Sequence, residues 1–370
     1  MRVGVPSEIK THEYRVGLTP ISVRELVHHG HEVLLQDNAG VGSGYSNADY
    51  ERVGGKIVAT AKDVFDAADM VVKVKEPLAP EIAMLRKGQL LFTYLHLAAD
   101  KKQTEGLMAS GCTAIAYETV TADDGSLPLL APMSEVAGRM AVQVGAHCLE
   151  KEQGGRGMLL GGIPGVGVAD VVVIGGGSVG ANAARMAMCL EARVTVLDKS
   201  IPRLRELELQ YGTTLNTIYS TVGALEQLLA KADLVIGAVL APGAAAPKAV
   251  SREMIKFMPQ GSVVVDVAID QGGCFETSRP TSHDNPTYVE EGVIHYCVTN
   301  MPGAVPRTST QGLSNVTLPF VLALANKGWQ QACRDDKHLL EGLNIHDGHV
   351  TYEAVARDPN LAYKPAAETL

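Results

Sequence analysis

Three ionisable side chains of complementary type each end an apolar run of the kind that forms a buried strand. His96 ends LLFTYLH, Lys75 ends MVVKVK and Asp270 ends VVVDVAID. In open α/β sheets, ligands bind beyond the carboxyl ends of the strands. We therefore expect a base, a cation and a carboxylate to face a substrate, with His96 as the acid/base group. The alternative for His96 is a core histidine held by a backbone carbonyl.

Strand periodicity separates an outer from an inner member in two of these runs. Side chains two residues apart share a face of a strand, which places Lys73 below Lys75 and Asp266 below Asp270. We expect the outer residues to carry function and the inner ones to form a buried pair or to anchor a loop. By the same rule, Tyr94 shares a face with the histidine.

A further cation, Arg15, follows the first predicted strand in EIKTHEYRVGLTP. A guanidinium binds a carboxylate through two parallel hydrogen bonds, so Arg15 is a candidate to hold a substrate carboxylate. The alternative is a loop arginine that pairs with Glu8 or Glu13.

A glycine pattern of GxGxxG spacing stands between an apolar strand and a helix in VVVIGGGSVGANAARMA. Gly175 permits a tight turn, Gly177 lets a pyrophosphate approach the backbone, and Gly180 lets the helix pack on the strand. N–H groups around Ser178 and Val179 then face an anion at the positive end of the helix. A purely structural glycine turn is the alternative, but this context favours a dinucleotide site.

An acidic residue completes this fingerprint at the end of the next strand. Asp198 ends ARVTVLD, eighteen residues after Gly180, and should accept hydrogen bonds from ribose hydroxyls. Because its charge would repel a 2′-phosphate, we predict NAD as the cofactor and not NADP. Arg203, five residues later, could neutralise such a phosphate, or it could be a surface arginine of the following helix.

Apolar runs alternate with helical patterns along the whole chain, which predicts an α/β fold. Unbroken Val and Leu runs are typical of strands that are covered on both faces, and hence of parallel sheets. In the first part of the chain we expect strands near 2–5, 32–36, 70–74, 90–97 and 113–117, and helices near 22–29 and 100–110.

A second series of six strands predicts one complete doubly wound dinucleotide unit. We expect these strands near 170–174, 193–197, 214–219, 233–237, 262–268 and 293–298. One long helix should follow Pro132 with Ser134 as its cap, and another should cover 308–327 with a kink at Pro319. The tail LNIHDGHVTYEAVA predicts a hairpin on Asp347–Gly348, followed by a helix, that packs on the first domain.

These patterns predict two doubly wound α/β domains joined by long helices. We expect a discontinuous substrate-binding and catalytic domain at 1–132 and 307–370, and a Rossmann NAD-binding domain at 133–306. A chain of 370 residues suits two domains of ordinary size.

Composition narrows the class of protein. The chain is 46% hydrophobic and 20% charged, as globular proteins are. A net charge of −9 argues against a nucleic-acid or anionic-membrane partner. No apolar run approaches the roughly 18 residues that span a bilayer, and the N-terminus lacks the apolar stretch of a signal peptide.

The cysteines and histidines give no sign of a disulfide framework or a metal site. The six cysteines contain no CxxC, which fits reduced, mostly buried thiols in a cytoplasmic protein. The group His28, His29 and His31 in VHHGHEV should be a solvated helix C-terminus.

The chain resembles the family of alanine dehydrogenases and NAD(P)-transhydrogenase α subunits over essentially its whole length. The stretches that carry the resemblance are RVGVPSEIKTHEYRVGLTP, VVKVKEP, LFTYLHLA, APMSEVAGRMA, LLGGIPGV, VVVIGGGSVGANAARMA, VDVAIDQGGCFETSRPT, VTNMPGAVPRTST and GHVTYEAVA. Where family members often read Pro–Ala–Arg before the dinucleotide strand, this chain reads GVGVAD.

The resemblance implies catalytic roles for His96 and Asp270 and substrate binding by Arg15 and Lys75, and we add Tyr94 and Asn300 as substrate contacts. It also implies a set of residues around NAD, with Met133 near the nicotinamide. The expected cofactor residues are Met133, Ser134, Gly175, Gly177, Ser178, Val179, Gly180, Asp198, Arg203, Ser220, Val239, Leu240, Val267, Ala268, Ile269, Arg279, Val298, Asn300 and Met301.

The implied reaction is the reversible oxidative deamination of L-alanine to pyruvate and ammonium, with NAD as hydride acceptor. Asp270 could orient water, assist proton transfer or hold a ribose hydroxyl. A homohexamer is implied as well. Two other functions remain: the nucleotide-binding subunit of a proton-pumping NAD(P) transhydrogenase, and a non-catalytic NAD-sensing module. The pairing of His96 with Lys75 and Arg15 argues against the first, and a sensing module would have no need of a histidine, a lysine and an aspartate together at strand ends.

Overall fold

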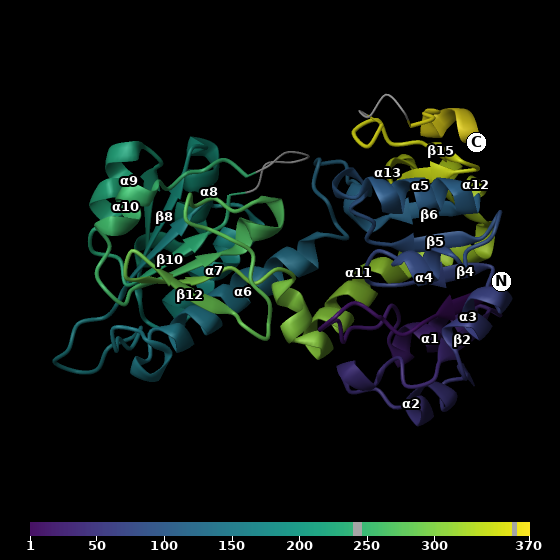
Figure 1. Ribbon diagram of the computed structural model, residues 1–370, viewed down its shortest axis with the longest axis horizontal. Helices are drawn as coiled ribbons and strands as arrows, with labels where there is room; N and C mark the ends of the chain where they lie inside the picture. Colours follow the sequence, from purple (N-terminus) through teal and green to yellow (C-terminus); the bar gives the residue numbers. More distant parts are fainter. Residues whose placement is uncertain (240–245, 357–360) are drawn as a thin grey trace. The chain divides into compact units, whose positions relative to one another are not determined.

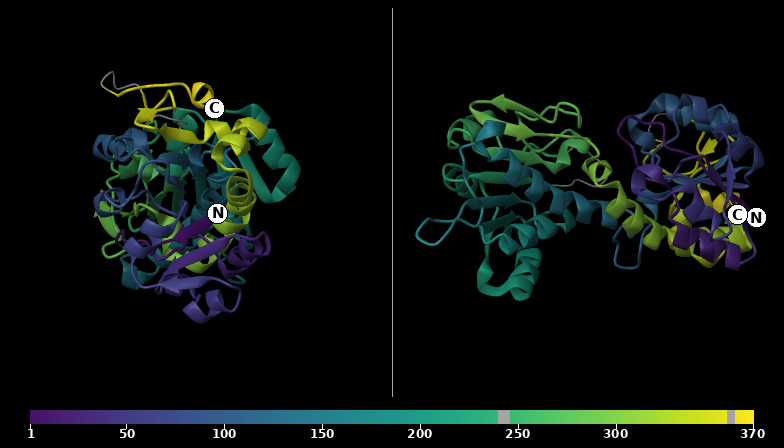
Figure 2. Two further views of the ribbon diagram at one scale, coloured as in Figure 1. Left: turned by 90° about the vertical axis from the view of Figure 1, so that its right-hand side faces the viewer. Right: turned by 90° about the horizontal axis from the view of Figure 1, so that it is seen from below.

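Two α/β units make up the part of the chain that the computed structural model describes, residues 1–239, 246–356 and 361–370. The first unit comprises Met1–Met133 and Val305–Leu370, and the second comprises Ser134–Ala304. Both chain ends lie on the first unit (Figures 1 and 2). The prediction of two doubly wound α/β domains is confirmed.

The first unit is built on an eight-stranded sheet of order β15-β14-β6-β5-β4-β1-β2-β3. Strands β1 to β6 are parallel. The hairpin β14–β15, which the sequence predicted to pack on this domain, pairs with β6 in the antiparallel sense. The strands are β1 Arg2–Val5, β2 Glu32–Gln36, β3 Lys56–Val58, β4 Met70–Val72, β5 Leu90–Thr93, β6 Thr113–Ala116, β14 Leu343–His346 and β15 His349–Val350.

Helices cover both faces of this sheet because the strand side chains are apolar on both sides. Met70 and Phe92 pack in one core with helices α1, α11, α12 and α13, whereas Val71 and Leu91 pack in another with α3 and α5. The helices of the unit are α1 Pro20–His28, α2 Asn47–Glu51, α3 Ala61–Ala67, α4 Ala79–Ile82, α5 Lys101–Ser110, α11 Pro306–Lys327, α12 Trp329–Asp335 and α13 Lys337–Glu341.

The second unit is built on a seven-stranded sheet of order β12-β13-β11-β10-β7-β8-β9. Its six parallel strands follow the order of a dinucleotide-binding Rossmann fold, and β12 is an antiparallel edge strand. The strands are β7 Asp170–Ile174, β8 Arg193–Asp198, β9 Leu215–Tyr219, β10 Leu234–Gly237, β11 Val263–Asp266, β12 Thr287–Glu290 and β13 Val293–Tyr296. The helices are α7 Ser178–Cys189, α8 Ile201–Tyr211, α9 Val222–Leu229 and α10 Arg252–Lys256, besides most of α6, Ala131–Cys148.

Several predicted boundaries are wrong. Strand β5 ends at Thr93 and β11 ends at Asp266, so strand alternation does not extend to His96 or Asp270. Ser134 is not a helix cap, because α6 begins at Ala131. Pro132 lies in the first turn of this helix, where a backbone N–H would have no partner within the helix, so proline is tolerated there. Residues 351–356 form turns, so the helix predicted after the tail hairpin is absent there.

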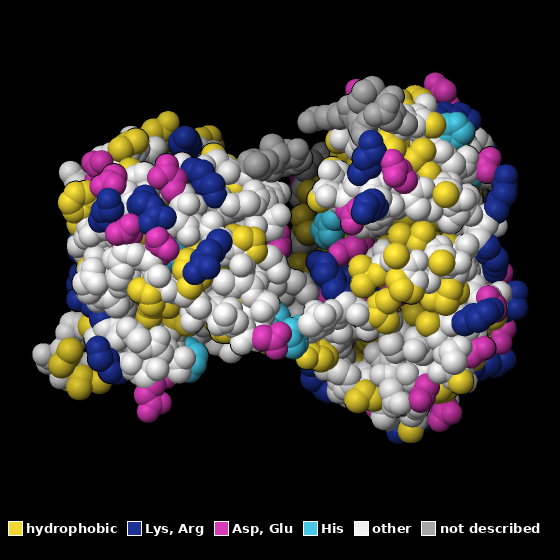
Figure 3. Space-filling model, viewed as in Figure 1, with side chains coloured by type: hydrophobic (Ala, Val, Ile, Leu, Met, Phe, Trp, Pro, Cys, Tyr) yellow, Lys and Arg dark blue, Asp and Glu magenta, His cyan; other side chains and the backbone are white. Residues whose placement is uncertain are grey.

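The distribution of charged side chains and the burial of the cysteines agree with what the composition predicted. Lys and Arg side chains alternate with Asp and Glu over the visible face of the described residues, without a continuous basic patch (Figure 3). All six cysteines are free, and only Cys189 is exposed. Among the described residues, no helix is long and apolar enough to cross a membrane.

Candidate functional site

The first sheet reverses its strand order between β1 and β4, which is where such folds form a crevice at the carboxyl ends of the strands. The loop that carries Arg15 follows β1, and Lys75 follows β4. The two segments lie against each other, since a Cβ atom on Gly17 would stand 2.5 Å from the carbonyl oxygen of Val72. His96 follows the next strand, β5.

Arg15 is buried and forms a two-bonded ion pair with Glu13, the pairing foreseen as its structural alternative. Its Nε donates to Oε1 at 2.7 Å and its Nη2 to Oε2 at 2.6 Å, while Nη1 contacts the Met133 sulfur at 3.0 Å. Burial disfavours the charge, but Glu13 outweighs burial and raises the pKa of Arg15 above its usual value. A substrate carboxylate would have to bind the other edge of the guanidinium, which carries Nη1 and Nη2.

Glu8 shapes the segment that precedes and includes Lys75. Its Oε1 accepts from the backbone N–H of Val74 at 2.7 Å and of Lys75 at 3.3 Å. Its Oε2 accepts from Lys73 at 3.0 Å, and Lys73 also donates to Glu81 at 2.6 Å. Lys73 is therefore a buried structural residue, as predicted, and the half-buried Lys75 is the outer one.

His96 is not a core histidine, because its side chain is 44% exposed. It has left-handed backbone geometry, with φ of 53°, in the turn between β5 and the 3₁₀ turn Leu97–Ala99. Its N–H donates to Glu118 Oε1 at 2.6 Å, and its Nδ1 lies 3.8 Å from the same oxygen.

Tyr94 lies beside the histidine but turns its hydroxyl away. The two rings stack with their centroids 5.9 Å apart and an interplanar angle of 4°. The Tyr94 hydroxyl donates to the carbonyl of Leu129 at 2.6 Å, and burial raises the pKa of this phenol. Substrate contact by Tyr94 remains a prediction.

The glycine turn of the second unit has the geometry that a dinucleotide site needs. Gly175 has φ of +100°, and a Cβ there would stand 2.6 Å from the Ala238 carbonyl. A Cβ on Gly180 would stand 1.8 Å from the Gly175 carbonyl, so α7 packs as closely on β7 as a glycine allows. Around Gly177, the N-cap of α7, nothing lies within 4 Å of such an atom.

Asp198 and Arg203 both hold this turn. Asp198 Oδ2 accepts from the N–H of Gly176 at 2.6 Å, and its Oδ1 accepts from Ser200 at 2.8 Å. Arg203 donates through Nε to the Gly176 carbonyl at 2.6 Å and through Nη1 to Glu206. Arg203 is therefore more than a surface arginine of α8, since its guanidinium fixes the peptide in the middle of the glycine turn.

Asp266 and Asp270 have separate environments. Asp266 is buried and anchors the loop after β11, as predicted, by accepting from Ala268, Cys274 and Ser278. Burial raises the pKa of Asp266, and these hydrogen bonds offset the shift only in part. Asp270 is exposed in the 3₁₀ turn Val267–Gln271.

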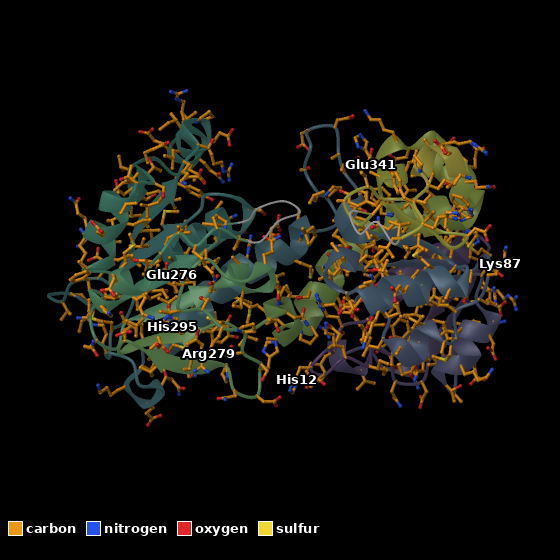
Figure 4. All side chains as sticks on the ribbon, turned by 45° about the horizontal axis from the view of Figure 1, so that its top comes forward. His12, Lys87, Glu276, Arg279, His295 and Glu341 are labelled. Carbon is orange, nitrogen blue, oxygen red and sulfur yellow. The ribbon has the colours of Figure 1, made fainter. Side chains whose placement is uncertain are left out.

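The other expected cofactor residues differ in exposure. Ser220 donates its N–H to the Asp198 carbonyl, and Arg279 lies 4.0 Å over the ring of Tyr288, which stacks on His295. Arg279 and His295 both belong to the second unit and are labelled in Figure 4. Asn300 has a left-handed backbone, with φ of 59°. Met133, Ala268, Ile269, Val298 and Met301 are buried, Ser134, Val179, Ser220, Val239, Val267 and Asn300 are half-buried, and Ser178 and Arg279 are exposed. Leu240 lies outside the described residues.

Three carboxylates hold the predicted residues; the sequence named Glu8 and Glu13 only as alternative partners of Arg15, and it assigned no role to Glu118. Glu8 holds the backbone of Lys75, Glu13 holds the guanidinium of Arg15, and Glu118 holds the backbone of the histidine. Glu118 directly follows the predicted strand 113–117, so the rule that ligands bind beyond the carboxyl ends of strands could have drawn attention to it. In the described part of the chain, no group of three or more His, Cys, Asp or Glu side chains could hold a metal ion.

The fold and these sites define a protein of two α/β units, one with a Rossmann-type glycine turn and the other with ionisable residues after adjacent parallel strands. The family profile described as "Alanine dehydrogenase/PNT, N-terminal domain" matches residues 4–137, and the one described as "Alanine dehydrogenase/PNT, C-terminal domain" matches residues 141–353. The chain belongs to this alanine dehydrogenase/PNT family, which confirms the resemblance seen in the sequence.

Similar proteins agree over the full length. The alanine dehydrogenase of Halomonas elongata is 61% identical and that of Mycobacterium tuberculosis 54% identical, each over all of both chains. A solved L-alanine dehydrogenase is 53% identical with a TM-score of 0.95, covering 98% of this chain and 100% of that one. The transhydrogenase from Sinorhizobium meliloti is 25% identical with a TM-score of 0.84, covering 95% of this chain and 100% of that one.

Proposed function

We propose that this chain catalyses the reversible oxidation of L-alanine by NAD⁺ and water to pyruvate, ammonium, NADH and a proton. The observation that carries the proposal is that Arg15, Lys75 and His96 lie in the segments that follow the adjacent strands β1, β4 and β5, around the reversal point of the first sheet. Full-length relatives named alanine dehydrogenase support the choice of substrate.

The glycine turn of the second unit fits NAD. The open space at Gly177 admits a pyrophosphate to the N–H groups at the start of α7, with the helix dipole behind it. The negative charge of Asp198 disfavours a 2′-phosphate, and Arg203 is engaged with Gly176 and Glu206. NAD, when bound, would supply the acceptor for the hydride that leaves the alanine Cα.

The residues of the first unit would orient the substrate and move protons. Arg15 would bind the substrate carboxylate and so fix the direction of the Cα–H bond. Such positioning can lower the activation free energy by several kcal/mol. Lys75 would stabilise the oxygen charge that develops as water adds to the imine and as pyruvate forms. His96 would accept and return the protons of that water. Asp270 belongs to the proposal as a second group that orients water or moves protons.

Assembly and location are part of the same proposal. We expect a homohexamer, as the family resemblance implies. We also expect a cytoplasmic location, because six free cysteines suit a reducing compartment. Light scattering of the purified protein would give the mass of the assembly. A monomer at working concentration would contradict the hexamer without affecting the proposed reaction.

The first test is the ultraviolet absorbance of NADH with L-alanine at alkaline pH, and the reverse reaction with pyruvate and ammonium. We expect turnover in both directions, and His96→Ala should lower kcat by about 10²–10⁴ while leaving NADH binding unchanged. His29→Ala, at the exposed end of α1, is the matched control and should behave as the wild type.

Two results would contradict the proposal. If the wild type formed no NADH from alanine, the proposed reaction would be excluded. A transhydrogenase subunit or an NAD-sensing module would give this result. Normal turnover by the His96 variant would remove the acid/base assignment.

A further inference from the structure

The turn that presents His96 is anchored on both sides of this residue. Leu95 is fully buried and Leu97 is 4% exposed, whereas the imidazole between them is 44% exposed. A residue with a side chain rarely adopts left-handed geometry, so the φ of 53° at His96 needs support from its surroundings. The exposed imidazole is thus carried by a short turn between two buried anchors.

Glu118 provides this support from the end of the neighbouring strand, β6. Its Oε1 accepts from the N–H of His96 at 2.6 Å and of Leu95 at 3.1 Å, and its Oε2 lies 3.2 Å from the Leu95 nitrogen. Two consecutive N–H groups that converge on one carboxylate form an anion-binding concavity of the backbone. The Glu118 side chain is only 17% exposed, so its bonds are partly shielded from water.

Helix α5 holds the carbonyl side of the same turn. Gln103 donates through Nε2 to the Leu95 carbonyl at 2.6 Å, and Thr104 donates through Oγ1 to the Leu97 carbonyl at 3.1 Å. The turn is therefore held from β6 through its N–H groups and from α5 through its carbonyls. Of these contacts, Glu118 is the one that carries charge next to the imidazole.

The same carboxylate also faces one ring nitrogen. Glu118 Oε1 lies 3.8 Å from Nδ1 of His96, within ion-pair distance, and the parallel ring of Tyr94 restricts how the imidazole turns. A carboxylate beside one ring nitrogen favours the tautomer that carries its proton there. Nε2 is then the nitrogen that exchanges protons with a reacting molecule.

We propose that Glu118 is a positioning residue for His96, which fixes the left-handed turn through two backbone N–H groups and directs the Nδ1 proton toward itself. The kinetic consequence rests on the proposed alanine dehydrogenase function. The structural consequence, protection of the Leu95 and His96 amides, does not depend on it.

Two variants separate the two contributions. Glu118→Gln keeps an acceptor oxygen for the N–H groups but removes the charge, and Glu118→Ala removes both. We expect kcat to fall about 10-fold in the Gln variant and about 100-fold in the Ala variant, with little change in NADH affinity. Glu105→Gln, on the exposed side of α5, is the matched control and should keep the wild-type kcat.

Hydrogen–deuterium exchange supplies a measurement that is independent of activity. Peptides that contain residues 95–97 should exchange faster in Glu118→Ala, and at nearly the wild-type rate in Glu118→Gln and Glu105→Gln. A lower kcat in the Gln variant with exchange preserved would support the contribution of charge beside Nδ1. Peptides from β1 and β2, in the core of the same unit, should be unchanged in all three variants, which would show that this unit is still folded.

Wild-type kcat in Glu118→Ala would overturn the proposal, whether or not exchange increased. Unchanged exchange at residues 95–97 in that variant would overturn the backbone role. If the wild-type chain failed to oxidise alanine, the proposed function would fail, while the exchange experiment would still decide whether Glu118 holds the turn.

Discussion

At the scale of single residues, the candidate site depends on carboxylates that the substrate need not touch. Glu13 aligns the guanidinium of Arg15, and Glu8 binds the N–H of Lys75 together with the ammonium of Lys73. Taking such charges out of water costs free energy that the pairing only roughly repays, so these pairs are better understood as fixing orientation than as adding stability.

Electrostatics keeps the cations of the site charged. Burial alone would lower the pKa values of Arg15 and Lys73, but the facing carboxylates outweigh it and raise both above their usual values. For the carboxylate Glu8, burial acts in the opposite direction and raises the pKa, and the charge of Lys73 offsets this rise only in part. A protonated guanidinium at position 15 is what a substrate carboxylate requires.

Replacing Arg15 by lysine tests this role. The substitution keeps a positive charge but removes the planar fork, so one substrate carboxylate can no longer receive two parallel hydrogen bonds. We expect Arg15→Lys to raise the KM for alanine and pyruvate about 10-fold or more, with a smaller effect on kcat. Steady-state kinetics in both directions would measure this.

Arg24→Lys, on the exposed face of α1, is the matched control. Thermal unfolding of each variant separates loss of binding from loss of the buried pair with Glu13. An unchanged KM in folded Arg15→Lys protein would exclude Arg15 from the carboxylate site.

The rule that ligands bind beyond the carboxyl ends of strands was sufficient to nominate His96 and Lys75 as candidates, because an ionisable residue after an apolar run is visible without any structure. Their roles stay predictions. The rule could not show that Arg15 is held by Glu13, since two loop residues have no periodic relation to a strand. For Asp270 the predicted strand was too long, because β11 ends at Asp266 and Asp270 lies in the 3₁₀ turn that follows. The strand face predicted for Asp270 therefore has no basis in the structure.

At the scale of elements, predicted strands were accurate where a polar turn follows the paired residues. Strands β1, β2 and β7 have the predicted bounds. Strands β5 and β11 are shorter than predicted because the chain leaves the sheet while its side chains are still buried, at Tyr94–Leu95 and at Ala268–Ile269. Burial and strand pairing are different properties, and an apolar run reports only the first.

Edge strands escaped prediction for a related reason. Strands β3 and β12 lie at sheet edges and contain half-buried or exposed residues, so neither forms an unbroken apolar run. The tail hairpin was predicted because the Asp347–Gly348 turn supplies a signal that does not depend on burial.

The close packing of α7 against the glycine turn after β7 can be tested by adding one methyl group at Gly180. Gly180→Ala would bring a Cβ to 1.8 Å from the Gly175 carbonyl, so the helix or the turn must shift. We expect a loss of about 1–3 kcal/mol in the free energy of unfolding and weaker NADH binding, measured by denaturant titration and by NADH fluorescence.

Gly223→Ala is the matched control in the same unit. Gly223 lies in α9, and nothing stands within 4 Å of an added Cβ, so alanine should leave NADH binding intact and stabilise the helix by up to about 1 kcal/mol. If Gly180→Ala bound NADH as tightly as this control, close packing at the turn would not matter for the cofactor.

At the scale of the whole molecule, the two units repeat one topology. In each, the six parallel strands follow the order third, second, first, fourth, fifth, sixth, and an antiparallel addition pairs with the sixth strand. The reversal point of the first sheet carries Arg15 and Lys75, and that of the second carries the glycine turn beside Ala238. We therefore propose that the equivalent position at the strand ends binds the polar substrate in one unit and the dinucleotide in the other.

The stability of the molecule should depend on a neutral histidine in the sixth strand of the second unit. His295 is fully buried in β13, with Nε2 2.7 Å from the Thr277 hydroxyl and Nδ1 3.0 Å from the Val293 carbonyl. Burial lowers the pKa of His295 below its ordinary value of 6.5, so the folded state holds the neutral ring. The unfolded chain therefore binds the proton more readily below that pH, and acid shifts the equilibrium toward unfolding.

We expect His295→Gln to be less stable than the wild type at neutral pH, because it loses packing against Tyr288. Below about pH 6.5 the difference should narrow by up to about 1.4 kcal/mol for each pH unit, since glutamine has no proton to bind. Denaturant titrations followed by circular dichroism across this range would measure it, with the exposed His147→Gln variant of α6 as control. Parallel stability profiles for the wild type and His295→Gln would mean that the protonation of this ring does not contribute to acid unfolding.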